Sequence, residues 1–525
     1  MKRRAFIQLA AVTSLATMAT EAAQKPAIPL PTDLMEATIS DLQATMQSGQ
    51  MSAEDIAIKY LARIKEIDPR INSILELNPD ALEIAEGLDN ERKAGKIRSP
   101  MHGIPVLIKD NIDTADKMHT TAGSLALLNA PTPAQDAFLV QRLRNAGAVI
   151  LGKTNLSEWA NFRSTKSSSG WSGRGGQTRN PYILDRNPCG SSAGTGSAVA
   201  ANLTAVGIGT ETDGSIICPS ATCGIVGIKP TLGLVSRSGV IPIAHSQDTA
   251  GPMCRTVADA AILLGVLVGR DASDSITAQA SKKGLKDYTK FLNKDGLRGK
   301  RIGVARQTFG KNSKIDAVIE PQLQVFKDGG ANLIDVEFPT NGKFGDAEFD
   351  VLLYEFKADL NKYLAIRGGN HKSIADLIKF NEENQAKEMP FFGQEIFYMA
   401  EKKGDLNDRK YRLALQKTKL LTQGQGIDAV MNKNKLDAFI APSGGVAWMT
   451  DLVNGDCGVF EGMTSIAAVA GYPSITVPAG FVQGLPCGIS FFGRAFSEST
   501  LISISYAFEQ MTKARRTPIF LPAYS

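Results

Sequence analysis

The stretch "GIPVLIKDNI", residues 103–112, decides the fold class and also contains an unusual residue. Apolar side chains run from Ile104 to Ile108 with only a proline among them, as in a strand that is buried on both faces. Lys109 follows at once, and Ile112 shows that the apolar surroundings continue beyond it. A lysine buried without a partner shifts its pKa downward and loses its proton. The alternative interpretation is that the strand ends at Ile108 and that Lys109 reaches solvent.

Short apolar runs and helical patterns alternate along most of the chain. Strand-like runs occupy residues 104–108, 148–152, 205–209, 224–229, 301–305, 436–441, 474–478 and 487–493. Helical patterns cover residues 136–147 and 256–269, and two earlier ones begin at N-cap signals, Ser52 and Asn78-Pro79. Buried strands separated by helices predict an α/β fold with a mixed, mainly parallel twisted sheet covered by helices on both faces.

Three segments are expected along the chain. Residues 1–23 have the features of an export signal, residues 24–103 form an N-terminal helical segment, and residues 104–525 form the main domain. Within that domain, residues 340–435 are more polar and rich in helix formers, which predicts a helical insertion over the sheet. Such an insertion is a common place for the wall of a substrate entrance, although packing alone would explain it equally well.

The N-terminus has the three parts of an export signal. A basic region, "MKRRAF", is followed by the apolar run "AFIQLAAVTSLATM" and by "TEAAQ", which indicates cleavage near Ala22 or Ala23. Arg3 and Arg4 resemble a twin-arginine signal, which exports folded proteins. The apolar run is shorter than the about 20 residues that span a bilayer, so no stable membrane insertion is expected. The sequence thus predicts an exported, periplasmic protein, or a cytoplasmic one if the signal is not used.

Composition excludes several classes of function. The chain has 525 residues, 43% hydrophobic and 21% charged, as in a soluble globular protein with a large core. Its formal net charge of +5 is small, so nucleic acid is not expected as a partner. None of the four histidines stands at a metal-ligand spacing from another histidine or cysteine, and no metal or cofactor is expected. The six cysteines are expected to stay unpaired, and the oligomeric state is left open.

Two segments are unusually rich in glycine and serine: "CGSSAGTGS", residues 189–197, and "GIGTETDGSI", residues 207–216. Such segments can turn backbone N–H groups toward a ligand. Neither fits a phosphate-binding motif, so nucleotide binding is the weaker interpretation. The stronger one is acyl transfer, with a serine nucleophile beside an oxyanion hole of backbone amides. A lysine that is neutral at pH 7 can serve as the base, and Lys109 has the apolar surroundings that this requires.

Three longer segments together resemble the amidase signature family, over about residues 37–523. "HGIPVLIKDNI" resembles the lysine strand of the family, residues 188–231 its Ser/Gly signature, and "GLPCGISFFGRAF" its C-terminal segment. Ser191 and Ser215 stand 24 positions apart, as in the family. The resemblance implies the amidase signature fold and the hydrolysis of carboxylic amides through a serine acyl-enzyme.

The resemblance also implies a Ser–cis-Ser–Lys triad. Ser215 is the expected nucleophile, Ser191 the bridging serine after a cis peptide bond, and Lys109 the base that receives the proton through Ser191. The oxyanion hole is expected from four backbone amides, those of Thr212, Asp213, Gly214 and Ser215. Many members have glycine in place of Asp213, so its carboxylate must point away from the oxyanion or be paired. The neighbouring Ser192 is expected to form only local hydrogen bonds.

Further segments resemble bacterial peptide amidases, which remove the C-terminal amide from peptides: residues 169–182, 209–216, 391–397 and 448–456. The predicted function is therefore the deamidation of C-terminal peptide amides with release of ammonia. The main alternative is an amidase of small aliphatic or aryl amides. Two further alternatives are the A subunit of an amidotransferase, which works on charged tRNA, and a catalytically inactive binding protein with the same fold.

Overall fold

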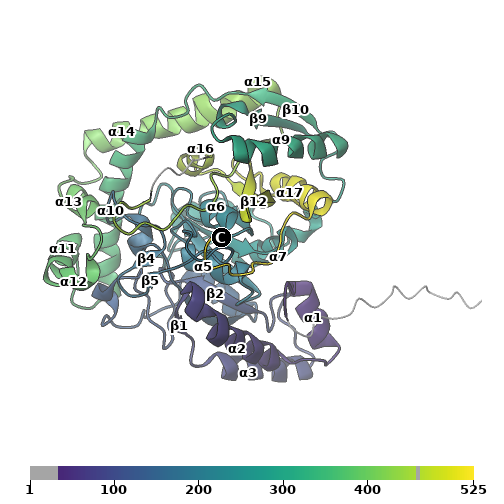
Figure 1. Cartoon of the computed structure of the whole chain (residues 1–525). Helices are drawn as coiled ribbons and strands as arrows, with labels where there is room; N and C mark the ends of the chain where they lie inside the picture. The colour runs from purple at the N-terminus through teal and green to yellow at the C-terminus, as the bar shows by residue number, and fades with distance from the viewer. Residues whose placement is uncertain (1–33, 457–461, 525) are drawn as a thin grey trace, which may run out of the picture.

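One sheet of eleven strands runs through the molecule (Figure 1). The structure, a computed structural model, describes residues 34–456 and 462–524, so the predicted signal at residues 1–23 lies outside the described part. In order across the sheet, the strands are β1 (Ile74–Leu77), β3 (Val149–Thr154), β2 (Pro105–Lys109), β6 (Val206–Glu211), β8 (Thr249–Cys254), β7 (Val226–Lys229), β12 (Ser474–Val482), β13 (Leu485–Phe492), β11 (Ala438–Pro442), β9 (Arg301–Ala305) and β10 (Asn332–Val336). A separate ribbon consists of β4 (Trp171–Ser172) and β5 (Gly176–Gln177).

The sheet is mixed, as predicted, but it is not mainly parallel. Parallel pairing joins β3, β2 and β6 near one edge and β11, β9 and β10 at the other. All strand pairs between these two groups are antiparallel, and so is the edge pair of β1 and β3. A short strand that is buried on both faces has the same apolar pattern in either direction, so the sequence did not reveal the antiparallel centre.

A tight hairpin between β12 and β13 belongs to this antiparallel centre. Val482 pairs with Leu485, and the turn residues Gln483 and Gly484 have φ angles of 49° and 81°. Positive φ at both residues is typical of a type I′ turn, which matches the twist of the two strands that it joins. The hairpin therefore places β13 between β12 and β11.

Helices cover both faces of the sheet, as predicted. A continuous layer on one face consists of α4 (Phe138–Asn145), α7 (Val257–Leu267), α17 (Glu498–Thr512) and α9 (Ser313–Asp328), and the short α8 (Ala280–Lys283) follows α7 in the chain. The other face carries α5 (Ala193–Ala200), α6 (Ile217–Thr222) and α16 (Thr464–Ala470).

Strand glycines allow α5 and α6 to approach the sheet closely. A Cβ atom at Gly207 would lie 2.6 Å from Thr195 Cγ2 in α5, and one at Gly227 would lie 2.3 Å from Ser220 Oγ in α6. Both distances are far shorter than ordinary van der Waals contact, so larger residues would push the helices away. The two glycines therefore allow α5 and α6 to pack directly against the central strands.

Three N-terminal helices, α1 (Ile39–Gln47), α2 (Ala53–Ile71) and α3 (Ala81–Lys93), lie at the lower end of the molecule in Figure 1. The N-cap predicted at Ser52 is confirmed, because its Oγ accepts a hydrogen bond from Asp55 N at 3.0 Å. The predicted start at Asn78 is wrong by two residues, since Asp80 is the N-cap of α3. The Asn78 side chain instead donates to the carbonyl of Ile150 in β3, at 2.9 Å.

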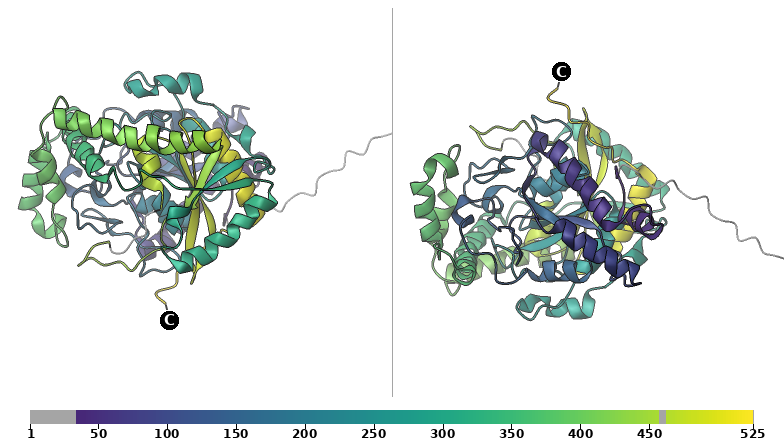
Figure 2. Two further views of the ribbon diagram at one scale, coloured as in Figure 1. Left: turned by 90° about the horizontal axis from the view of Figure 1, so that it is seen from above. Right: turned by 90° about the horizontal axis from the view of Figure 1, so that it is seen from below.

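Residues 340–435 contain six helices: α10 (Gly345–Arg367), α11 (Ile374–Glu383), α12 (Gln385–Glu388), α13 (Glu395–Glu401), α14 (Arg409–Lys419) and α15 (Asp428–Asn434). A π-helical segment, Leu420–Ile427, joins α14 to α15, and Figure 2 shows this long helical run across one side of the molecule. Figure 1 shows α10 to α14 as an arc beside the sheet. A hydrophobic cluster that includes Trp159, Phe162 and Phe356 joins this arc to the rest of the main domain.

The two ends of the described chain are joined by an ion pair. Arg515 Nε and Nη2 donate to the Glu36 carboxylate at 2.7 and 2.8 Å, and Thr517 Oγ1 donates to it at 3.1 Å. The segment that leads into α1 is therefore attached to the segment that follows α17.

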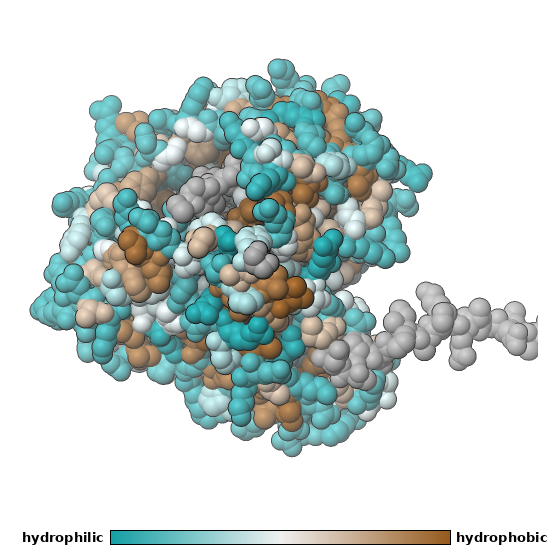
Figure 3. Space-filling view, viewed as in Figure 1, coloured by the Kyte–Doolittle hydropathy of each residue, from teal (hydrophilic) through white to brown (hydrophobic). Residues whose placement is uncertain are grey.

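The surface carries no broad apolar area on the face seen in Figure 3, where hydrophobic residues form several separate patches among hydrophilic ones. None of the helices formed by residues 34–456 and 462–524 has the length and hydrophobicity needed to cross a membrane.

Candidate active site

Lys109 is the last residue of β2, between β3 and β6 in the sheet, and it is fully buried. Its Nζ lies 2.7 Å from Ser191 Oγ, 2.9 Å from Thr210 Oγ1 and 3.3 Å from Thr210 O. Burial lowers the pKa of Lys109 to about 7, against the opposing effect of the Glu211 and Asp248 carboxylates. The interpretation in which this lysine reaches solvent is therefore wrong.

Ser191 lies just before α5 and follows a cis peptide bond from Gly190. Its carbonyl accepts a hydrogen bond from Ser157 N at 3.0 Å. The adjacent Ser192 binds β6, because its Oγ donates to Thr210 O at 3.1 Å and accepts from Thr210 N at 3.2 Å. The hydrogen bonds of the Ser192 side chain therefore have a structural role. The expectation that they are local is wrong, because they join Ser192 to β6, 18 positions further along the chain.

Ser215 lies in the loop between β6 and α6. Its carbonyl accepts a hydrogen bond from Ser192 N at 3.2 Å, which brings the two serine-bearing segments into contact. Glu211 supports the loop from the end of β6, since its Oε2 accepts hydrogen bonds from Ile216 N at 2.7 Å and Ile217 N at 3.0 Å. The structure therefore places all three predicted triad residues in one buried region.

The loop before α6 also presents backbone amides. Within the described part of the chain, the amides of Gly214 and Ser215 donate to no protein acceptor. Thr212 is held in place by Asp248, whose Oδ1 accepts from Thr212 Oγ1 at 2.6 Å, and by Gln247, whose Nε2 lies 3.3 Å from Thr212 O. A pair of N–H groups on a fixed loop beside a serine is an arrangement that can bind an oxyanion.

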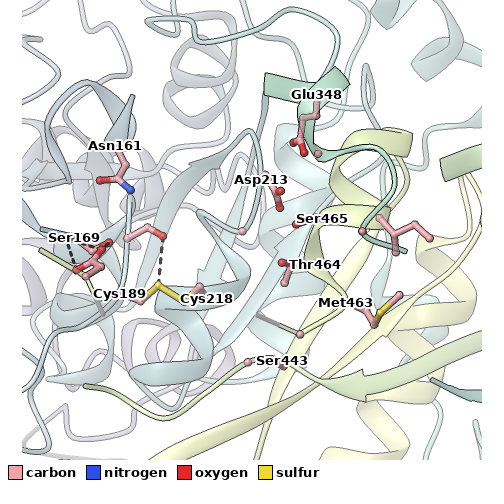
Figure 4. Close-up of a pocket in the computed structure, with 18 of the residues that line it drawn as sticks. Asn161, Ser169, Cys189, Asp213, Cys218, Glu348, Ser443, Met463, Thr464 and Ser465 are labelled. Atoms are coloured by element: carbon pink, nitrogen blue, oxygen red, sulfur yellow. Dashed lines mark hydrogen bonds between the residues drawn. A yellow bond between two sulfur atoms is a disulfide. The ribbon is translucent and has the colours of Figure 1, made fainter. Parts of the chain in front are cut away.

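A cavity of about 750 Å³ lies beside the segments that carry the two serines. Gly190 and Gly214, the residues that precede Ser191 and Ser215, both line it. Figure 4 shows mainly polar side chains in its wall: Asn161, Ser169, Asp213, Glu348, Thr464 and Ser465. The volume lies within the range of about 300–1,000 Å³ that is usual for ligand pockets.

The resemblance described above implies that Asp213 replaces a glycine of many family members, and the Asp213 side chain lines this cavity. The backbone amide of the residue is unaffected by the exchange, so a potential oxyanion donor is kept. What changes is the charge, because a carboxylate is added to the cavity wall close to the two serines.

A disulfide joins Cys189 to Cys218. Cys189 precedes Ser191 by two residues and Cys218 follows Ser215 by three, so the bond links the two segments that carry the serines. The expectation of unpaired thiols is therefore wrong for this pair, which is 29 positions apart and is brought together by the packing of α5 against α6. The expectation is confirmed for three buried free cysteines, Cys223, Cys254 and Cys487, while Cys457 lies outside the described residues.

One group among the described residues has the donor atoms for a metal ion: His245, Glu355 and Asp359. The spacing in the sequence did not predict it, because the histidine is far from both carboxylates in the chain. Its donors are already engaged, since His245 Nδ1 lies 2.7 Å from Asp359 Oδ2, while Ser246 N and Tyr411 OH donate to Glu355. Burial opposes protonation of His245, but its hydrogen bond with Asp359 and the charges of the Glu355 and Asp359 carboxylates raise its pKa.

The chain matches the Amidase family over residues 55–502. It therefore belongs to the amidase family, a class of hydrolases that act on amides, and the sheet with its helical layers is the amidase signature fold.

Several relatives support this assignment. The structure of the peptide amidase from Stenotrophomonas maltophilia is 50% identical, has a TM-score of 0.90, and is matched over 94% of this chain and 100% of that chain. A probable amidase of Arabidopsis thaliana is 42% identical over 93% of this chain and 92% of its own length. The A subunit of the glutamyl-tRNA(Gln) amidotransferase from Caldanaerobacter subterraneus is 34% identical over 93% of this chain and 98% of its own length.

Proposed function

We propose that Lys109, Ser191 and Ser215 form the catalytic triad of this amidase. The observation that carries the proposal is the 2.7 Å contact between Lys109 Nζ and Ser191 Oγ at a buried position. A neutral Nζ has two N–H groups and one lone pair. Thr210 O can only accept, and Thr210 Oγ1 is a second acceptor, so these atoms can take both N–H groups. The lone pair is then directed to the hydroxyl proton of Ser191.

In the proposed reaction, Ser215 Oγ attacks the carbonyl carbon of the amide and forms a new C–O bond. Its proton passes to Ser191 Oγ, while the proton of Ser191 passes to Lys109 Nζ. Collapse of the tetrahedral intermediate breaks the C–N bond, and Lys109 returns a proton through Ser191 to the leaving nitrogen, which departs as ammonia. Water then hydrolyses the acyl-enzyme through the same relay, which yields the carboxylic acid and restores Ser215.

The oxyanion of the tetrahedral intermediate would accept hydrogen bonds from the loop that precedes α6. The amides of Gly214 and Ser215 lack other protein acceptors among the described residues, and those of Thr212 and Asp213 precede them in the same loop. Fixed N–H groups stabilise charge that develops only in the transition state, which commonly accelerates a reaction by about 100-fold per donor or more.

We further propose C-terminally amidated peptides as substrates. The proposal is supported by the 50% identity to the peptide amidase from Stenotrophomonas maltophilia, and by a largely polar cavity that can surround the end of a peptide. Hydrolysis would convert the terminal carboxamide into a carboxylate and release ammonia, without cleavage of internal peptide bonds.

The experiment is mass spectrometry on a panel of amidated peptides and small aliphatic and aryl amides. A gain of about 1 Da at the C-terminus, with no shorter peptides, is expected, because NH₂ is replaced by OH. Turnover of the small amides without turnover of peptide amides would contradict this substrate class and would favour a small-amide amidase.

The similarity to the A subunit of an amidotransferase motivates a second candidate function, in which the chain acts in a complex on charged tRNA. Binding of tRNA is the discriminating measurement. Release of ammonia from peptide amides by the isolated chain, together with no detectable tRNA binding, would decide for the peptide amidase.

A further inference from the structure

A strained turn lies between the segment that contacts Ser191 and the helical insertion. Trp159, Ala160 and Asn161 follow one another with φ angles of 52°, 54° and 72°. This is the left-handed region, which residues other than glycine rarely adopt. Such a conformation is unfavourable and persists only where the surrounding structure imposes it, so the turn must be held by other parts of the chain.

Ser157, two positions before the turn, is in direct contact with the segment of Ser191. Its backbone N–H donates to the carbonyl of Ser191 at 3.0 Å, and its Oγ accepts a hydrogen bond from Gly170 N at 2.8 Å. A Cβ atom at Gly190 would lie 2.1 Å from Ser157 Oγ, so the two segments pack without space between them. A displacement of the turn would therefore also displace Ser191.

The helical insertion holds the other end of the turn, at Arg163. Arg163 Nη1 donates to the carbonyl of Glu388 in α12, and the carbonyl of Arg163 accepts from Ile396 N in α13 at 3.1 Å. The Glu388 side chain extends further, since its Oε1 accepts from Leu125 N at 2.6 Å. Glu388 thus connects α12 to two segments of the main domain.

The carboxyl groups of Glu158 and Glu388 meet beside the guanidinium of Arg163, and all three residues are buried. Arg163 Nη1 lies 2.9 Å from Glu158 Oε1 and 4.0 Å from Glu388 Oε2. A Cβ atom at Gly173, between β4 and β5, would lie 2.6 Å from Glu388 Oε2 and 3.0 Å from Glu158 Oε2. Figure 1 shows α12 on the side of the molecule where the β4–β5 ribbon lies. The two carboxyl groups converge and form a hydrogen bond with each other.

That hydrogen bond requires a proton. An ionised carboxylate only accepts hydrogen bonds, so two carboxyl groups can bond to each other only when one of them is protonated. The charges lead to the same conclusion, because the Arg163 guanidinium balances one carboxylate, and a second buried carboxylate would be uncompensated. Burial accordingly raises the pKa of both Glu158 and Glu388, against the opposing effect of Arg163.

The charged residues next to this cluster in the chain do not supply a second cation. Arg174 follows Gly173, but its guanidinium is paired with the carboxylates of Glu76 and Asp110. Lys387 precedes Glu388 and is exposed to solvent. A shared proton is therefore what keeps the buried cluster neutral.

We propose that Glu158 and Glu388 share one proton, and that the resulting bond makes Glu388 a positioning residue for Ser191. The bond joins α12 to the residue that follows Ser157, and so holds the strained turn against the segment of Ser191. The positioning role rests on the proposed function, because Ser191 affects the reaction only as a member of the triad.

The kinetic test compares two substitutions of Glu388. Glu388→Gln keeps a hydrogen-bond donor without needing a proton, and it should leave kcat and KM for a peptide amide within about twofold of the wild type. Glu388→Met has a similar size but cannot donate, and it should lower kcat at least about tenfold with a smaller change in KM, because a displaced Ser191 slows proton transfer. Glu383→Gln is the matched control, since Glu383 is an exposed carboxylate on α11.

The shared proton is tested without catalysis, by urea unfolding between pH 5.5 and 8.5. The unfolded chain releases this proton above about pH 4.5, whereas the folded protein retains it to higher pH. Rising pH therefore favours unfolding of the wild type, but this contribution is absent from Glu388→Gln. The folding equilibrium constant of the wild type relative to Glu388→Gln should fall by up to about tenfold per pH unit. Glu383→Gln should follow the wild type.

Three outcomes would overturn the inference in whole or in part. Parallel pH curves for the wild type and Glu388→Gln would refute the shared proton. Wild-type kcat in Glu388→Met, or an equal loss of kcat in both variants, would refute the positioning role; if Glu388→Met does not fold, as judged by circular dichroism, Glu388→Ala replaces it. If no peptide amide were hydrolysed, the proposed function and the positioning role would fall together, while the pH curves would still decide the shared proton.

Discussion

Lys109 owes its chemistry to the strand that carries it. The residues before it in β2 are all buried, and the lysine shares their environment although its side chain ends in an amine. The three oxygen contacts of Nζ satisfy its hydrogen-bonding capacity, so the amine can be neutral without an unpaired buried polar group. Burial, rather than a neighbouring cation, is thus what prepares this residue to accept a proton.

The first prediction concerns substitution of this lysine. Lys109→Arg should lower kcat/KM by about 100- to 10,000-fold, because a guanidinium does not lose its proton in the working range. Lys109→Met, which is similar in length and cannot accept a proton, should lose a similar amount. Lys59→Arg is a suitable control, since Lys59 is exposed on α2. A folded Lys109→Arg enzyme with near-normal activity, checked by circular dichroism, would show that Lys109 is not the base.

The second prediction concerns the pH dependence of activity. Only the neutral form of Lys109 can accept a proton, and its pKa in the folded protein is about 7. Below pH 7, kcat/KM should therefore fall about tenfold for each unit of pH, and above pH 7 it should approach a plateau. Steady-state rates between pH 5 and 9 on an uncharged peptide amide would measure this. A rate that is flat across pH 6 to 8 would contradict a titrating base with this pKa.

The third prediction detects the same titration without catalysis. The pKa of Lys109 is lower in the folded protein than its ordinary value of 10.5, so between about pH 7 and 10.5 the unfolded chain binds a proton that the folded one does not. The contribution of Lys109 to stability therefore increases with pH across this window, by up to about 1.4 kcal/mol per unit. The free energy of unfolding should rise more steeply with pH in the wild type than in Lys109→Met between pH 7.5 and 9.5. Parallel curves would refute the lowered pKa.

Among the elements, α5 and α6 carry the site, and the Cys189–Cys218 disulfide connects the segments that lead into them. The bond closes a loop that includes β6, and so limits how far the two serine-bearing segments can separate. Its contribution comes mainly from restricting the unfolded chain, and for cysteines 29 positions apart it is about 3.6 kcal/mol.

The fourth prediction follows from that bond. The double variant Cys189→Ala/Cys218→Ala should lower the free energy of unfolding by about 3.6 kcal/mol and should also lower kcat/KM, since the cavity is lined by both cysteines. Denaturant titration and kinetics measure the two effects. Dithiothreitol should reproduce them in the wild type and should change nothing in the double variant. Full stability and activity of wild-type protein whose thiols are shown to be reduced would contradict the prediction.

The elements that sequence reasoning found, and those that it missed, differ in their composition. Uninterrupted apolar runs such as residues 104–108 predicted strands correctly. β8 was not predicted, because Gly251 and Pro252 interrupt its apolar pattern, and glycine and proline normally indicate a turn. Two edge strands were also not predicted. β1 has only four residues, none of them fully buried, and β10 exposes the polar residues Asn332 and Asp335, so its apolar pattern is weak.

The same limit applies to the site. Lys109, Ser191 and Ser215 belong to motifs, so their positions could be named from the sequence, and the structure brings them together. Ser157 and Gln247 could not be found, because their roles depend only on contacts with residues distant in the chain. The Cys189–Cys218 disulfide could not be predicted either, since six cysteines allow many pairings and only the fold determines which two come together.

At the scale of the whole molecule, we propose that the chain is exported in its folded state. The motivation is the twin arginine at residues 3–4 with its short apolar run, and the disulfide supports it, because such bonds persist in oxidising compartments. The fifth prediction is that periplasmic material begins near Ala23 or Gln24 in N-terminal sequencing, and that Arg3→Lys/Arg4→Lys blocks its appearance there. Recovery of the chain with an intact Met1 from the cytosol alone would contradict export.

The ion pair between Glu36 and Arg515 has a consequence for the order in which the segments of the fold can follow one another along the chain. Where segments near the start and the end of a fold lie together, the fold tolerates circular permutation, in which a short linker joins these segments and new ends are opened in an exposed turn. The turn at Gly310 and Lys311 is such a place, because it is exposed and a Cβ at Gly310 would meet no other atom. A chain that started at Lys311 would form β6, α5 and α6 from one continuous stretch, as the natural chain does. The architecture of the active site thus depends on which segments are neighbours, and not on which of them is translated first.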